Sequence, residues 1–334
     1  MAGIGLLAGN TFAQTDAPYK VLDTVQLMGT GGIDYVYADN DARRVYVPRG
    51  GNTFVFGLDD HKYIGAITNV SGHGIAIHTP THHGFSSSPQ LGMFDTQTME
   101  KIKSIEVQGR PDGIMLEPFT DKVFVFSHQA PSITVVDPKD GTVVGTIDVG
   151  GAMEQGQSDG QGKIYVNVED EKKIAVVDVK AMKLITKYDL GESAGHPSGL
   201  GFDVKNHVLF AMCAEPSVCV IVNSDTGKVI TTLPIGNGTD NGGFNPSTME
   251  AFSSQRDGTL TVIKEASPTS FSVEQTVQTK PGCKTMSIDT KNNRIVTICT
   301  ERMPGAQAEA TPPDGQRRRG NRGPGNLDVL WVGR

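Results

Sequence analysis

Ionisable side chains recur at a nearly constant interval along this sequence. A first column of residues, 39 to 44 positions apart, stands at the openings of successive apolar runs and comprises Gly31, His73, Asp112, Glu154, Ser198, Asp240 and Lys284. Each residue of a second column lies 15 to 18 positions after its counterpart in the first column. The second column comprises Arg49, Ser88, His128, Glu169, Ala214, Gln255 and Glu301. If the two columns meet in space, five carboxylates and two imidazoles share one rim with only Lys284 and Arg49 as permanent cations.

Such a rim favours a bound cation or a polar ligand. Crowded carboxylates resist ionising together unless a proton or a cation joins them. Rings of oxygen atoms suit Ca²⁺, and two histidines among carboxylates also suit Zn²⁺ or Mn²⁺. We therefore predict a ligand-binding rim made of His73, Asp112, His128, Glu154, Glu169, Asp240, Lys284 and Glu301. Within it, the predicted metal ligands are Glu154, Glu169 and Asp240. The alternative is a water-filled mouth lined with solvated charges, in which Lys284 and Arg49 pair locally.

No familiar catalytic motif accompanies this rim. The sequence contains no G-x-S-x-G elbow, no H-E-x-x-H pair, no P-loop and no C-x-x-C-H haem motif. We therefore assign no catalytic residue.

The segments that must position the rim are short strands. Residues 163–191 read as three of them, because apolar and polar side chains alternate with period two between turn residues. The same pattern recurs at 122–150 and 207–236. The third strand closes on Asp95, Asp137, Asp178 and Asn223 in four successive copies, 41 to 45 residues apart. A strand-only repeat of this period indicates the blades of a β-propeller.

The repeats predict an all-β chain folded as one seven-bladed β-propeller, with four antiparallel strands per blade. A chain of 334 residues is otherwise long enough for two domains, but blades bury their faces only against neighbouring blades. The last blade supplies only three strands of its own, and the strand at 19–28 precedes the first complete repeat. We expect that N-terminal strand to close the last blade, so that residues 15–334 form a single domain.

The strand opening K-I-Y-V-N at 163–167, followed by A-V-V-D, resembles the YVTN-repeat propellers. With the blade openings H-G-I-A-I, R-P-D-G-I-M-L, H-P-S-G-L-G-F-D and C-K-T-M-S-I-D, residues 19–334 are similar to exported bacterial YncE-like β-propellers. The resemblance implies the fold and an exported protein, and it leaves the ligand open.

Residues 1–14 are small and apolar and end in T-F-A-Q, which is similar to the end of a secretory signal. We interpret them as a residual signal peptide, which predicts a periplasmic or secreted protein. The alternative is an apolar N-terminus that carries no targeting signal. No other window reaches the length of a membrane span.

Residues 303–326 interrupt the last blade with proline, glycine and charge, which predicts a flexible insertion. Its arginines could form a basic arm for an anionic partner: Arg317, Arg318, Arg319 and Arg322. We favour a solvated loop, because long surface insertions cost little and a net charge of −7 argues against a nucleic-acid surface elsewhere.

The four cysteines form two pairs across predicted hairpins, Cys213 with Cys219 and Cys283 with Cys299. Both pairs could become disulfides, which suits an oxidising compartment. The alternative is four buried free thiols.

Together these features predict a monomeric binding or scaffold protein that engages a small polar ligand or a protein partner at the channel mouth. The alternative function is a metal-dependent hydrolase or lactonase. Its carboxylate rim would hold a cation that polarises a carbonyl or activates water.

Overall fold

Blade four shows how the alternating pattern becomes a sheet. Strand β15 (Lys163–Val168) pairs antiparallel with β16 (Lys173–Asp178), and the 3₁₀ turn η2 (Glu169–Glu171) reverses the chain between them. Ile164 packs toward blade three and Tyr165 toward blade five, because successive side chains point to opposite faces of a strand. Each blade thus fills two inter-blade cores at once.

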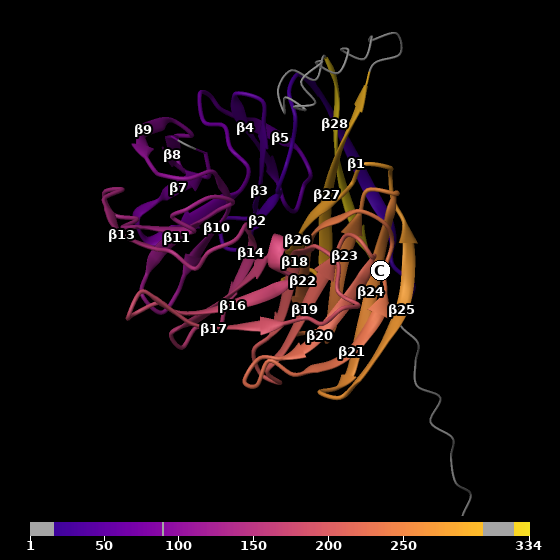
Figure 1. Ribbon diagram of the computed structural model, residues 1–334. Helices are drawn as coiled ribbons and strands as arrows, with labels where there is room; N and C mark the ends of the chain where they lie inside the picture. The colour runs from indigo at the N-terminus through magenta and orange to yellow at the C-terminus, as the bar shows by residue number, and fades with distance from the viewer. Residues whose placement is uncertain (1–16, 89, 303–323) are drawn as a thin grey trace, which may run out of the picture.

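The computed structural model describes residues 17–88, 90–302 and 324–334, and within them the strands form seven four-stranded antiparallel sheets. In Figure 1 the labels of the inner strands gather near the centre, and those of the outer strands lie at the periphery. The seven-bladed prediction is confirmed. Residues 1–14, interpreted above as a residual signal peptide, and residues 303–323 of the insertion lie outside the described residues.

Blades one to six take their strands in chain order, from the innermost outward, and blade seven takes its outermost strand from the N-terminus. Blade one comprises β2 (Tyr37–Asp39), β3 (Arg44–Arg49), β4 (Asn52–Gly57) and β5 (Tyr63–Ile67). Blade two comprises β6 (Ile75–His78), β7 (His83–Ser86), β8 (Gln90–Asp95) and β9 (Lys101–Glu106), with the 3₁₀ turn η1 (Thr79–Thr81). Blade three comprises β10 (Pro111–Glu117), β11 (Lys122–Ser127), β12 (Ile133–Val136) and β13 (Val143–Ile147).

Blade four adds β14 (Met153–Ser158) inside and β17 (Lys183–Asp189) outside the two strands given above. Blade five comprises β18 (Pro197–Asp203), β19 (Val208–Cys213), β20 (Val218–Asn223) and β21 (Val229–Pro234). Blade six comprises β22 (Thr239–Asn245), β23 (Glu250–Gln255), β24 (Thr259–Ser267) and β25 (Ser270–Gln278). Blade seven comprises β26 (Thr285–Asp289), β27 (Arg294–Arg302), β28 (Gly325–Gly333) and β1 (Lys20–Gly29).

The seam of the ring lies in blade seven, as predicted. Its strand order is β1-β28-β27-β26, so the N-terminal strand forms the outer edge of the last blade. Arg49 of blade one is buried and donates hydrogen bonds to the carbonyls of Leu27, Gly29 and Gly325. The guanidinium therefore ties blade one to both strands that close the ring.

The recurrent residues that close the third strands are turn caps. The side-chain oxygens of Asp95 and Asp178 each accept hydrogen bonds from backbone N–H groups two and three residues later. Asn223 does the same, and Asp137 caps the N–H two residues on. Side chains of this kind mimic a backbone turn. The 41 to 45-residue period seen in the sequence is thus the period of one turn at the end of each third strand.

The inner strands of blades four to six are joined without charged groups. A Cβ on Gly199 would lie 2.4 Å from the carbonyl carbon of Asn241, so only glycine permits this approach of β18 to β22. Gln155 of β14 accepts hydrogen bonds from the N–H groups of Leu200 (2.9 Å) and Gly242 (3.1 Å) and donates one to the Gly242 carbonyl (2.9 Å). One neutral amide therefore links three blades.

The four cysteines are buried free thiols, so neither expected disulfide is formed in the structure. Cys213 stands opposite Val218 and Cys219 opposite Met212, which places the two thiols on opposite faces of blade five. The predicted pairing of Cys213 with Cys219 is therefore wrong. Cys283 and Cys299 share one small core cluster in blade seven.

Among the described residues, no helix is long and apolar enough to cross a membrane.

Candidate functional site

A network of ionisable side chains collects where the innermost strands begin. Most of its members immediately precede an inner strand or occupy its first positions, and one follows the second strand of blade three. The members come from blades one, two, three, four, six and seven: Asp34, Tyr35, His73, Asp112, His128, Glu154, Asp240 and Lys284. We call this set the mouth network.

The first half of the mouth network is centred on Lys284. Its ammonium group lies 3.0 Å from Asp34 Oδ1 and also contacts Asp240 Oδ2. The second oxygen of Asp34 lies 2.6 Å from Nδ1 of His73, and the backbone N–H of Tyr35 donates to the His73 carbonyl at 3.1 Å. Ion pairs therefore bridge blades six, seven, one and two in succession.

The second half is centred on His128. Its Nε2 atom lies 2.7 Å from Asp112 Oδ2 and 2.8 Å from Glu154 Oε1. His73 Nδ1 lies 3.1 Å from the other oxygen of Asp112, which joins the two halves. The Tyr35 hydroxyl donates a 2.8 Å hydrogen bond to Glu154 Oε2. Because Tyr35 comes from blade one and Glu154 from blade four, the phenol reaches across the ring.

Burial and neighbouring charges shift the pKa values in the network. Burial raises the pKa of Asp34, but the hydrogen bond from His73 and the charge of Lys284 outweigh it and hold that pKa well below its usual range. Burial lowers the pKa of His128, but Asp112 and Glu154 outweigh it and raise it to about 10. Burial is also the main reason that the pKa values of Glu154 and Tyr35 are raised.

Solvent reaches the two halves unequally. The side chains of His73 and Asp240 are 28% and 26% exposed, whereas that of Asp112 is 6% exposed. The network thus runs from an open end at blades two and six to a buried end at Asp112, His128 and Glu154. A small ligand can approach the open end, while the buried end is shielded from bulk water.

The structure brings together six of the eight residues predicted for the rim and leaves out two. Glu169 is half-buried, and its charge contributes to raising the pKa of Glu154. Glu301 is exposed and pairs at 2.9 Å with Lys280, which is not a member of the network. Over the described residues, the two groups that could hold a metal ion are Asp34–His73–Asp112 and Asp112–His128–Glu154. The expected trio Glu154, Glu169 and Asp240 is not one of them, and Asp240 instead contacts Lys284.

Asp34 and Tyr35 were missed because Gly31 was aligned with the blade openings. A better signal lies at the other end of each inner strand. An Asp, Glu or Asn stands, in six of the seven blades, five positions after Asp34 or after the blade's own member of the first column, and blade two has a histidine there: Asp39, His78, Glu117, Asp159, Asp203, Asn245 and Asp289. Asp39 caps the backbone of Asp41 and Ala42. Counting back five positions from Asp39 gives Asp34, so alignment on these far-end residues would have placed it in the column.

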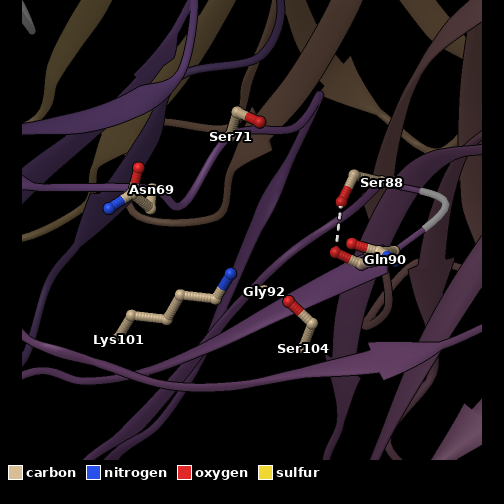
Figure 2. A pocket seen from close by; sticks show the side chains of 7 residues that line it. All are labelled: Asn69, Ser71, Ser88, Gln90, Gly92, Lys101 and Ser104. Atoms are coloured by element: carbon tan, nitrogen blue, oxygen red, sulfur yellow. Dashed lines mark hydrogen bonds between the residues drawn. The ribbon is translucent and has the colours of Figure 1, made fainter.

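Surface hollows also occur away from the network. One of about 300 Å³ lies over blade two and is lined by polar side chains from β8, β9 and the neighbouring loops (Figure 2). Within it the Ser88 hydroxyl donates to the Gln90 carbonyl at 2.6 Å, across residue 89, which is not described. None of the mouth-network residues lines this hollow.

No family model matches the sequence, and no curated protein matches it. Solved structures with a similar fold include U3-55K, with a TM-score of 0.74 and 8% identity over 94% of this chain and 99% of that one. The WD40 repeats of RRP9 give 0.70 and 10% over 95% and 100%. The WD40 β-propeller domain of Doa1 gives 0.68 and 14% over 95% and 97%. At these identities the likeness shows the β-propeller fold alone.

Proposed function

We propose that this protein is a binding propeller that holds a small, positively charged ligand at its channel mouth. The observation that supports the proposal is the charge balance of the mouth network. Four carboxylates face one ammonium and two imidazoles, so the network keeps a negative charge even when both imidazoles are protonated. Partly desolvated carboxylates attract cations more strongly than carboxylates in water do.

The shape of the network suits a ligand that enters from one side. Asp240 and His73 are the more exposed members, and they would meet the ligand first. Tyr35 spans from blade one to Glu154 at the buried end of the network. A cation that reaches this buried end would exchange water for carboxylate oxygens.

A panel of small cations tests this function in thermal-shift and calorimetric titrations. Putrescine and choline represent organic ammonium ligands, and Zn²⁺, Mn²⁺ and Ca²⁺ represent metal ions. We expect at least one of them to raise the melting temperature of the wild type and of Asp140→Asn, whose carboxylate lies on an exposed turn of blade three. An ammonium compound should lose most of its effect on Asp34→Asn/Asp240→Asn, and a metal ion should lose most of its effect on Glu154→Gln. Binding of none of these cations, or undiminished binding of a cation by every one of these variants, would refute the proposal.

A metal-dependent hydrolase is the second candidate. The observation that favours it is the Asp112–His128–Glu154 group, because three protein ligands leave coordination positions open for water and substrate. Hydrolysis of lactones and aryl esters by the Zn²⁺- or Mn²⁺-loaded protein, lost in Glu154→Gln, would support it. A metal-loaded protein without turnover would leave the binding function.

We also propose membership of the YncE-like family, export to the periplasm or medium, and a monomeric state. The repeat motifs support the first, and the leader-like residues 1–14 support the second. Fractionation of cells and light scattering of the mature chain test export and oligomeric state. A protein partner would be sought only if every small cation fails. The arginines of the insertion (Arg317, Arg318, Arg319 and Arg322) lie outside the described residues and carry no part of this proposal.

A further inference from the structure

The contacts of His128 are unusual at the buried end of the mouth network. Its Nε2 atom lies 2.7 Å from one carboxylate oxygen of Asp112 and 2.8 Å from one of Glu154. The nitrogen is buried and meets hydrogen-bond geometry with neither oxygen. One N–H group points at one acceptor, so a single proton cannot serve both short contacts well.

A metal ion can bind all three of these atoms at once, whereas one proton can form a good hydrogen bond with only one acceptor. We infer that Asp112, His128 and Glu154 form a binding site for a divalent first-row transition-metal ion, which names the cation of the binding function proposed above and rests on it. The three ligand atoms lie within 4.8 Å of one another. All three side chains are at least nine-tenths buried, at 6%, 10% and 8% exposure.

Neighbouring side chains contact the second carboxylate oxygen of two of the three ligands. Glu154 Oε2 accepts the Tyr35 hydroxyl at 2.8 Å, and Asp112 Oδ1 lies 3.1 Å from His73 Nδ1. The backbone N–H of His128 donates to the Arg110 carbonyl at 3.0 Å. Outer contacts of this kind fix the orientation of metal ligands. On Asp112 and Glu154, the other carboxylate oxygen is the one that faces His128 Nε2.

The backbone also keeps the ligands close. A Cβ on Gly113 would lie 2.7 Å from the Glu154 carbonyl oxygen, so β10 approaches β14 this closely only because residue 113 has no side chain. The hydroxyl of buried Ser87 donates to the Asp112 carbonyl on the other side. Asp112 is therefore fixed between blades two and four, at the distance that brings its carboxylate to Glu154.

The donor set selects the class of metal. One imidazole nitrogen with two carboxylate oxygens suits Zn²⁺, Mn²⁺ and related ions, whereas Ca²⁺ takes oxygen ligands only. The neighbouring group Asp34–His73–Asp112 is less suitable, because Lys284 lies 3.0 Å from Asp34 and supplies a positive charge there already. The ion is therefore assigned to the buried end of the network.

The test is a Zn²⁺ titration of the full, tag-free chain after chelation, by calorimetry with a competing chelator, and repeated with Mn²⁺ and Ca²⁺. We expect one Zn²⁺ per wild-type chain and no comparable Ca²⁺ binding. Glu154→Gln and His128→Gln should weaken Zn²⁺ by more than the ~10–100-fold that loss of an outer contact costs, and Tyr35→Phe by an amount within that range. Asp140→Asn and the double variant His82→Gln/His83→Gln should match the wild type, and each variant's melting curve shows whether it folds.

Four results would overturn the assignment. Wild-type protein that binds putrescine or choline but neither Zn²⁺ nor Mn²⁺ refutes the metal site and leaves the proposed binding function intact. If Zn²⁺ binding persists in Glu154→Gln but is lost in Asp34→Asn, the ion lies in the Asp34–His73–Asp112 group. If Zn²⁺ binding is lost only in the His82/His83 double variant, the ion binds at the surface. Failure of every cation refutes the metal site and the proposed function together.

Discussion

Carboxylates are buried at both ends of the propeller's inner strands, but the two ends neutralise them differently. At the mouth, Asp34 and Asp112 face Lys284, His73 and His128. At the opposite end of β18, Asp203 and Glu265 are both buried, and the amide of Asn206 donates to each of them at 2.8 Å. We call Asp203, Asn206 and Glu265 the far-end cluster. It contains no cationic side chain.

The difference appears in the direction of the pKa shifts. At the mouth, cationic partners keep the pKa of Asp34 well below its usual range despite burial. In the far-end cluster, burial and the charge of Asp203 outweigh Asn206 and raise the pKa of Glu265 to about 7. A carboxylate with a cationic neighbour stays ionised and can exchange that neighbour for a ligand. A carboxylate without one takes up a proton and responds to pH instead.

Removal of the central ammonium group should have the largest effect. Lys284→Met leaves Asp34 and Asp240 without their shared cation, and we expect a loss of about 3 kcal/mol in the free energy of unfolding, measured in urea. Lys62→Met is the matched control, because Lys62 is an exposed partner of Asp60 at 3.5 Å and should leave the urea midpoint unchanged. Equal effects of the two substitutions would mean that the mouth network is solvated like an ordinary surface.

The far-end cluster should respond to pH in the opposite sense from a salt-bridged acid. The folded state holds a proton on Glu265 up to about pH 7, whereas the unfolded chain releases it near 4.5. This contribution to stability is present below pH 4.5 and is lost as the pH rises through 7. Glu265→Gln should therefore stabilise the protein at pH 8 by up to about 3 kcal/mol, with no gain at pH 4. Exposed Glu192→Gln serves as the control, and a pH-independent difference would contradict the assignment.

The close approach of two inner strands at the mouth gives a smaller effect. Gly113→Ala forces a methyl group toward the Glu154 carbonyl, and we expect a cost of about 2 kcal/mol together with weaker Zn²⁺ binding. Gly32→Ala meets no atom within 4 Å and should change neither property. If the Gly113 variant bound Zn²⁺ like the wild type, the spacing between β10 and β14 would not control the site.

Removal of one hydroxyl should have the smallest effect on stability. Tyr35→Phe deletes the donor to Glu154 while keeping the ring, which should lower the free energy of unfolding by about 1 kcal/mol. Tyr63→Phe changes a half-exposed tyrosine and should leave the melting curve unchanged. A Tyr35 variant as stable as the wild type would mean that the hydrogen bond from the phenol to Glu154 does not stabilise the mouth network.

The fold could be predicted from the sequence because its repeat reflects local structural requirements. Asp95, Asp137, Asp178 and Asn223 recur since each third strand needs a side-chain cap for its turn, and the strands between them alternate with period two. The seam followed from counting strands, because blade seven is one short and the strand at 19–28 precedes the first repeat.

The site could be predicted only in part. The repeat predicts which residues lie at the same end of the inner strands, but it does not predict which of their side chains contact one another. His73, Asp112, His128 and Glu154 share the mouth as expected. Which carboxylate a cation engages depends on side-chain reach across blades, as when Lys284 takes Asp240 out of the predicted metal set. Tyr35 lay outside every column, since its role comes from spanning the ring and not from the repeat.

The most direct test of the central claim is anomalous diffraction from crystals soaked in Zn²⁺, with data collected on both sides of the zinc absorption edge. We expect one strong peak about 2.0–2.2 Å from the facing atoms of Asp112, His128 and Glu154. A peak confined to Asp34 and His73, or to surface histidines, would contradict it.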